Sequence, residues 1–75
     1  MKDPQKRTEI QEGQVLEALP SLKFRIRMET DGREIIAYLS GRLAIRRIRI
    51  LPGDKVRVEL SLYDANRGRI VYRLS

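Results

Sequence analysis

The sequence of 75 residues contains no cysteine, no histidine and no tryptophan. Without cysteine there is no disulfide framework and no thiolate metal site, and without histidine the usual zinc sites and serine–histidine nucleophile pairs are excluded. No apolar run approaches the roughly 20 residues of a membrane-spanning helix, and no signal-peptide core follows the N-terminal stretch. No carboxylate pair or glycine-rich phosphate loop stands out. We therefore expect a cytoplasmic protein with no membrane partner, no cofactor and no enzymatic activity.

A chain of 8.8 kDa has room for one hydrophobic core only. Residues 1–8 are polar, include Pro4 and show no apolar periodicity. We expect these residues to form a flexible tail, and residues 9–75 to form a single folded domain.

Charge is distributed unevenly along the chain. The net charge is +6, from 16 Lys and Arg against 10 Asp and Glu. Residues 1–38 hold equal numbers of acids and bases, so the whole excess lies in residues 39–75. Such a concentration of positive charge indicates a polyanionic partner, of which nucleic acid is the simplest. An acidic membrane surface is the alternative, but no amphipathic basic helix accompanies the charge.

Alternation of apolar and polar residues predicts five short strands. They lie at residues 15–19, 22–28, 35–39, 56–62 and 69–73. The alternation assigns these side chains to the buried faces: Leu22, Phe24, Ile26, Met28, Val56, Val58, Leu60, Leu62, Ile70 and Tyr72.

The segments between these strands contain turn residues, notably Asp31-Gly32 and Pro52-Gly53. Residues 41–50 are long enough for one or two helical turns between the third and fourth strands. The order β-β-β-α-β-β predicts an all-β fold, a five-stranded OB-fold Greek-key barrel with a short helical turn between strands 3 and 4. An SH3-like barrel is the structural alternative, although its helical element usually falls near the last strand.

The segment after the third strand is the first candidate binding site. Four arginines, Arg42, Arg46, Arg47 and Arg49, fall within eight residues that contain no acid. Their mutual repulsion favours an anionic partner over a merely solvated surface. For Arg49 the alternative is a surface ion pair with Asp54 or Glu59.

The last hairpin and strand supply Arg67, Arg69 and Arg73 as further candidates. Strict alternation would place Arg69 and Arg73 on the same outer face. The alternative role for these residues is the ordinary charge of an edge strand. Arg25 and Arg27 are weaker candidates, because Glu29 and Glu34 can neutralise them across the hairpin.

Several blocks of the sequence resemble the bacterial and plastid translation initiation factor one, in order and in register over about residues 10–74. The blocks are Val15–Pro20, Phe24-Arg25, Ser40-Gly41-Arg42, Ile48–Asp54, Tyr63-Asp64 and Arg67–Arg73.

The resemblance implies an OB-fold protein without catalytic activity that binds the small ribosomal subunit at the aminoacyl site, as a monomer. Its partners would be ribosomal RNA, a neighbouring ribosomal protein and the other initiation factors, and it would block that site during initiation. Tyr38 stands where the family often has histidine or an aromatic residue, so it either stacks on a base or belongs to the barrel wall.

This sequence departs from the family pattern in two places. The Asp31-Gly32 hairpin is one residue longer, and Ala44 and Ile45 replace two basic residues, with arginine following at 46 and 47. Two other functions stay open. One is a general single-stranded RNA or DNA binder, or an RNA chaperone of cold-shock type, although that class uses aromatic motifs and this chain has four aromatic residues in all. The other is a module whose basic face binds an acidic protein.

Overall fold

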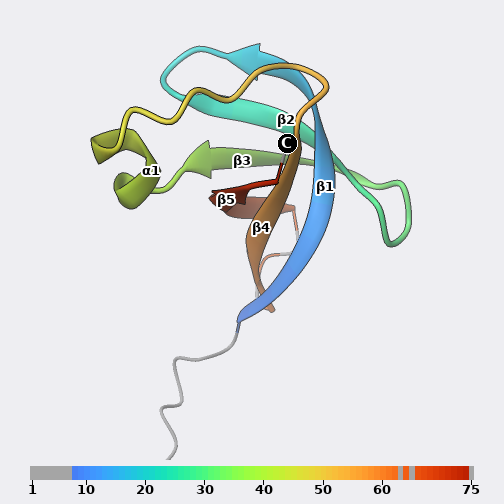
Figure 1. Cartoon of the computed structure of the whole chain (residues 1–75). Coiled ribbons are helices and arrows are strands. Elements are labelled where there is room, and N and C mark those ends of the chain that lie inside the picture. Colours follow the sequence, from blue (N-terminus) through green and yellow to red (C-terminus); the bar gives the residue numbers. More distant parts are fainter. Residues whose placement is uncertain (1–7, 63, 65, 75) are drawn as a thin grey trace, which may run out of the picture.

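The computed structural model describes residues 8–62, 64 and 66–74, with five strands and one short helix in this part of the chain (Figure 1). The predicted order β-β-β-α-β-β is confirmed. The elements are β1 (Thr8–Leu19), β2 (Lys23–Met28), β3 (Glu34–Leu39), α1 (Gly41–Ile45), β4 (Lys55–Ser61) and β5 (Arg67–Arg73). Thr8 already belongs to β1, so the barrel begins one residue before the predicted boundary, and the rest of the predicted tail lies outside the described residues.

The strands close into a barrel in the order β1-β2-β3-β5-β4, with β4 pairing back to β1. Neighbouring strands are antiparallel except β3 and β5, which run parallel. Helix α1 lies between β3 and β4 in the chain, beside one end of the barrel (Figure 1). This arrangement confirms the predicted OB-fold and not the SH3-like alternative.

Strand β1 is long because it pairs with both β2 and β4, and its pairing with β4 closes the barrel. Its first half pairs with β4 and its second half with β2, and Gly13 takes part in both pairings. A Cβ atom at Gly13 would lie 2.6 Å from Cγ2 of Ile26 and 2.9 Å from the carbonyl oxygen of Arg27. Glycine therefore permits the close approach of backbones where β1 curls around the barrel.

The barrel interior confirms most of the predicted alternation. Phe24, Ile26 and Met28 of β2 and their counterparts on β4 are buried. Leu43 of α1 adds to this core from outside the sheet. The buried apolar residues are Val15, Phe24, Ile26, Met28, Ile35, Ala37, Leu43, Ile50, Val56, Val58, Leu60 and Ile70.

Two predicted core residues lie outside the barrel. Leu22 and Leu62 are each 60% exposed. Ser21 and Leu22 have positive φ angles of 65° and 58°, so the chain is still turning there and β2 begins only at Lys23. Strand β4 ends at Ser61, so the alternation that assigned Leu62 to the core continues beyond the strand.

A bulge in β5 overturns the predicted placement of Tyr72 and Arg73. Ile70 pairs with Val58 but Tyr72 pairs with Arg57, so Val71 is an extra residue on β5. Tyr72 is therefore 54% exposed, with the guanidinium of Arg57 5.5 Å from the centre of its ring. Arg73 lies opposite Val56 and Arg69 opposite Glu59, so the bulge breaks the alternation by which these two arginines were predicted to share a face, although both side chains are exposed.

Candidate nucleic-acid interface

Helix α1 is a single turn that fixes the start of the arginine-rich segment. Ser40 has extended backbone angles and its Oγ accepts a hydrogen bond from the backbone N–H of Leu43 at 3.3 Å, which caps the helix. Leu43 is the helix's buried residue and anchors the turn to the core. The segment then leaves the helix at Arg47, whose φ of 56° is left-handed. With Leu43 held inward, the arginines on either side of it lie on the outer surface.

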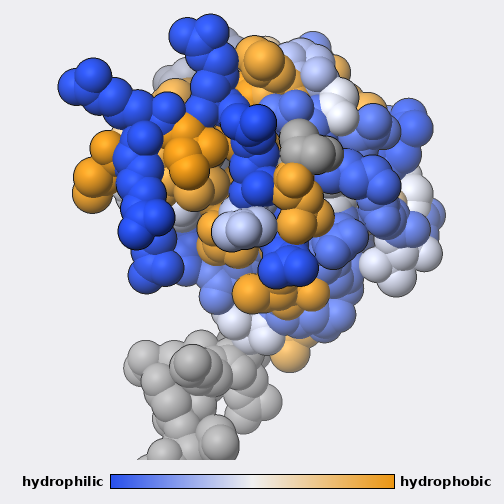
Figure 2. Space-filling view, viewed as in Figure 1, coloured by the Kyte–Doolittle hydropathy of each residue, from blue (hydrophilic) through white to orange (hydrophobic). Residues whose placement is uncertain are grey.

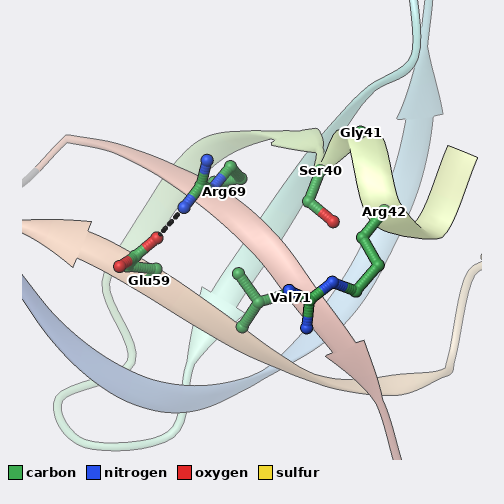
Figure 3. Close-up of a pocket in the computed structure, with 6 residues that line it drawn as sticks. All are labelled: Ser40, Gly41, Arg42, Glu59, Arg69 and Val71. Atoms are coloured by element: carbon green, nitrogen blue, oxygen red, sulfur yellow. Dashed lines mark hydrogen bonds and ion pairs between the residues drawn. The ribbon is translucent and has the colours of Figure 1, made fainter.

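Arg42 and Arg69 line a common hollow between the start of α1 and strands β4 and β5 (Figure 3). Arg69 is directed to Glu59 on β4, while Arg42 extends from the helix across β5 towards Val71 (Figure 3). Ser40 and Gly41 complete the lining. The hollow therefore has a cation on each side.

Two neighbouring hollows extend this surface in both directions. Arg42 also lines a hollow with Arg46 and Arg73. Arg69 also lines one with Arg67 and Tyr38. Six of the eight predicted residues are thus joined through shared hollows. We call this surface the basic face: Tyr38, Arg42, Arg46, Arg67, Arg69 and Arg73.

Arg47 and Arg49 lie beside the basic face rather than on it. Both line a hollow with apolar side chains, among them Phe24 and Ile48. The two regions touch where Nη1 of Arg73 donates a hydrogen bond to the backbone carbonyl oxygen of Arg49 at 3.3 Å. All eight predicted residues therefore lie around α1, β5 and the adjoining ends of β3 and β4, but in two adjacent groups.

Ion pairs divide the arginines of the interface into two kinds. Arg67, Arg69 and Arg73 pair with Asp64, Glu59 and Asp54 respectively. Those carboxylates are the three acids of residues 39–75. Within residues 8–62, 64 and 66–74, no carboxylate lies within 4.0 Å of the four arginines of the segment after β3, namely Arg42, Arg46, Arg47 and Arg49. The ion pair considered for Arg49 is therefore not formed, because both candidate acids pair with β5.

Tyr38 and Arg25 differ clearly in their surroundings. Tyr38 is 52% exposed on β3, so its ring is available to a ligand. Arg25 is neutralised as expected, since it pairs with Glu34 at 3.7 Å and also with Glu17 at 2.7 Å. Arg27 lies opposite Glu34 in the β2–β3 register. The Tyr38 ring is thus exposed, whereas the charge of Arg25 is already paired.

Sequence reasoning missed two residues of this region. Lys23 lines a hollow with Tyr38 and Arg67, and it lies directly opposite Tyr38 in the β2–β3 register. Counting back from a two-residue Asp31-Gly32 turn would have placed Tyr38 opposite Arg25 instead, because the connection spans residues 29–32 and shifts the register by two. Glu59 was considered only as a partner of Arg49, yet it lies within the basic face and pairs with Arg69.

Exposed apolar side chains accompany the arginines near α1. Ile45 is 83% exposed and Leu51 51% exposed. Figure 2 shows this pattern on the side of α1, where long hydrophilic side chains alternate with hydrophobic ones. Ala44 and Ile45, which replace two basic residues of the family pattern, also lie on this surface. This departure from the pattern therefore falls within the candidate interface.

No cluster of three metal-ligating side chains occurs among the described residues. In the same part of the chain no helix is long and apolar enough to span a bilayer. What the described residues do bring together is a set of guanidinium groups, suited to phosphate, and an exposed tyrosine.

The fold and this surface define a small OB-fold barrel with a strongly basic side. A family model for translation initiation factor 1A / IF-1 matches residues 1–75, the whole chain. The chain is therefore a member of the translation initiation factor 1A / IF-1 family, as the resemblance indicated.

Similar solved structures include the following two. Translation initiation factor one from the Wolbachia endosymbiont of Brugia malayi superposes with a TM-score of 0.77 and 39% identity, covering 99% of this chain and 86% of that chain. YjeQ from Thermotoga maritima superposes with a TM-score of 0.73 and 22% identity, covering 89% of this chain but 23% of that one. The second likeness shows the barrel fold alone.

Proposed function

We propose that this initiation factor binds the small ribosomal subunit at the aminoacyl site through the basic face and the adjoining Arg47 and Arg49. It blocks that site during initiation and cooperates with the other initiation factors. Its contacts are with ribosomal RNA and a neighbouring ribosomal protein, it binds as a monomer, and it acts in the cytoplasm. Membership of the family supports the setting, translation initiation.

The observation that carries the proposal is the set of four arginines after β3 that no described carboxylate neutralises. Like charges gathered on so small a barrel repel one another, and phosphates are the ligands that would offset this repulsion. Arginine also binds phosphate in a bidentate manner, with two parallel hydrogen bonds. A surface of this kind fits a folded RNA, which presents many phosphates in fixed positions.

Occupation of a site requires binding and no chemical step. We propose that the protein acts sterically and is not an enzyme. Shape and charge dominate recognition, because among the described residues only two aromatic side chains, Tyr38 and Tyr72, line the hollows of the basic face, and Tyr72 already contacts Arg57. A surface with many arginines and few aromatic rings favours structured ribosomal RNA as the ligand. Proteins that bind single strands without sequence preference instead stack successive bases on aromatic rings.

Co-sedimentation with purified ribosomal subunits tests the proposal. We expect selective binding to the small subunit over the large one, weakening steeply as salt rises because several phosphate contacts release counterions. An Arg49→Ala/Arg69→Ala variant should lose this binding.

Three results would contradict the proposal. Failure to sediment with small subunits even at low salt would refute it outright. Equal affinity for arbitrary single strands and for subunits would favour the general nucleic-acid binder. Binding that survives nuclease treatment and resists salt would favour an acidic protein partner.

A further inference from the structure

A carboxylate, that of Glu59, lies inside the basic face. Its side chain is 24% exposed and is paired with Arg69. It lines both the hollow that contains Arg42 and the hollow that contains Tyr38 (Figure 3). Glu59 therefore lies where a ligand that spans the basic face would pass.

For a surface that binds only phosphates, this carboxylate is unfavourable. It repels phosphate, and it competes for the guanidinium of Arg69, which a phosphate would otherwise bind. An ionised carboxylate can only accept hydrogen bonds, so the ligand group that suits it is a donor. Nucleotides carry such donors in the ribose 2′-hydroxyl and in the exocyclic amino groups of bases.

The geometry of the hollow offers both kinds of contact at once. Arg42 lies on one side without a described acidic partner, and Glu59 lies on the other side, held in place by Arg69. Because Arg42 and Glu59 line the same hollow, one ligand can place a phosphate beside Arg42 and a hydrogen-bond donor beside Glu59. A nucleotide carries both groups, since its sugar and base lie next to its phosphate. Bare polyanions supply the first contact and not the second.

On the basis of the proposed function, we infer that Glu59 is a specificity-determining residue of the interface. The hollow between Arg42 and Glu59 takes one nucleotide, whose phosphate binds Arg42 and whose donor group binds the carboxylate of Glu59. By repelling extra phosphate, Glu59 lowers affinity for polyanions in general. By accepting a hydrogen bond, it retains affinity for RNA.

The test is Glu59→Gln, which keeps the shape of the side chain but removes its charge. Glu17→Gln is the matched control, because Glu17 also pairs with an arginine, Arg25 at 2.7 Å, but lies on β1 and lines none of the hollows of the basic face. Both variants raise the net charge by the same amount. Melting temperatures of both variants verify that the fold is intact.

Binding is measured to inorganic polyphosphate and to RNA and DNA single strands of one sequence. Glu59→Gln releases Arg69 from an exposed ion pair, so this variant should bind polyphosphate more tightly. The gain should exceed any gain in Glu17→Gln by about two- to fivefold. The salt dependence should steepen by about 0.7 for each further phosphate that is bound. Affinity for RNA should rise less than affinity for polyphosphate, or fall, because the neutral amide oxygen of glutamine is a weaker acceptor than the carboxylate.

The two nucleic acids distinguish the source of the donor. If the 2′-hydroxyl binds Glu59, the preference for RNA over DNA falls in Glu59→Gln. If a base amino group binds Glu59, the affinities of Glu59→Gln for RNA and for DNA fall by the same factor relative to its affinity for polyphosphate. A Glu59→Asp variant keeps the charge but shortens the side chain, so it should keep the weak polyphosphate binding and lose affinity for nucleic acid.

Identical changes in Glu59→Gln and Glu17→Gln for all three ligands would overturn the inference. So would an equal gain for RNA, DNA and polyphosphate in Glu59→Gln alone, since Glu59 would then act only as a competing charge. Wild-type protein that shows this selectivity on free strands but does not bind small subunits would refute the proposed function and leave the role of Glu59 standing.

Discussion

Arg42 and Arg46 should be dispensable for folding but essential for RNA binding. The N–H of Arg46 donates to the carbonyl oxygen of Arg42 at 3.2 Å, so Arg46, the C-cap residue of α1, lies one helical turn after Arg42. Like charges at this spacing destabilise a helix by roughly 0.2–0.5 kcal/mol. Because glutamine and arginine have similar helix propensities, an Arg42→Gln/Arg46→Gln variant should have a free energy of unfolding equal to or slightly above that of wild type.

The same variant should bind RNA much more weakly. Hydrogen bonds to charged groups contribute about 1.5–3 kcal/mol each when buried in a complex, so the loss of two phosphate contacts should weaken binding by at least about a hundredfold. The slope of log affinity against log salt should become shallower by about 1.4–1.8, since each contact accounts for about 0.7–0.9. Denaturant unfolding measures the first quantity, and fluorescence anisotropy with a labelled ribosomal RNA fragment at several salt concentrations measures the second.

Arg25→Gln is the matched control, because Arg25 pairs with both Glu17 and Glu34 away from the basic face. It should lose up to about 1 kcal/mol of stability, the upper value for exposed ion pairs, and keep its RNA affinity. The reasoning is refuted if Arg25→Gln weakens RNA binding as much as the double variant does. It is also refuted if the double variant unfolds more easily than wild type, because its arginines would then be structural.

Three further predictions concern other parts of the molecule. Ala44→Arg/Ile45→Lys places charge at the exposed positions where the family carries basic residues, and it should strengthen RNA binding and steepen its salt dependence in the same anisotropy assay; unchanged affinity would show that these positions do not contact RNA. Gly68→Ala should destabilise the fold by about 1–3 kcal/mol in denaturant unfolding, because the new Cβ would lie 2.5 Å from Cγ1 of Val58; a stability equal to wild type would show that the barrel wall yields. Ser40→Ala should cost about 0.5–2 kcal/mol, since Ser40 caps α1, and a loss below that range would mean that α1 does not depend on this cap.

The strands could be predicted because each half-buried strand alternates residue by residue. Phe24, Ile26 and Met28 alternate with charged residues and are buried as a set. The same signal failed at Leu22 and Leu62, because sequence alternation continues past the residue at which the backbone leaves the sheet. Backbone angles and strand pairing decide where a strand stops, and the pattern of apolar residues predicts neither of them.

The interface was predictable in composition but not in detail. The absence of acids around Arg42 and Arg46 is visible in the sequence, and their lack of a described acidic partner follows from it. The extra residue Val71 leaves no signal in the sequence, so the alternation between Arg69 and Arg73 was wrongly expected to be unbroken. Pairing of Glu59 with Arg69 follows from the β4–β5 hairpin, where the two residues lie directly opposite each other, and counting along that hairpin could have predicted it.

Competition at the aminoacyl site tests the proposed function most directly. Small subunits carrying messenger RNA and initiator tRNA are saturated with this protein, and a labelled anticodon stem-loop cognate to the aminoacyl-site codon is then added. We predict that wild-type protein excludes the stem-loop in a concentration-dependent manner, while the Arg42→Gln/Arg46→Gln variant requires at least about a hundredfold more protein. Simultaneous binding of the stem-loop and the wild-type protein to the same subunits would contradict the proposal that this barrel occupies the aminoacyl site.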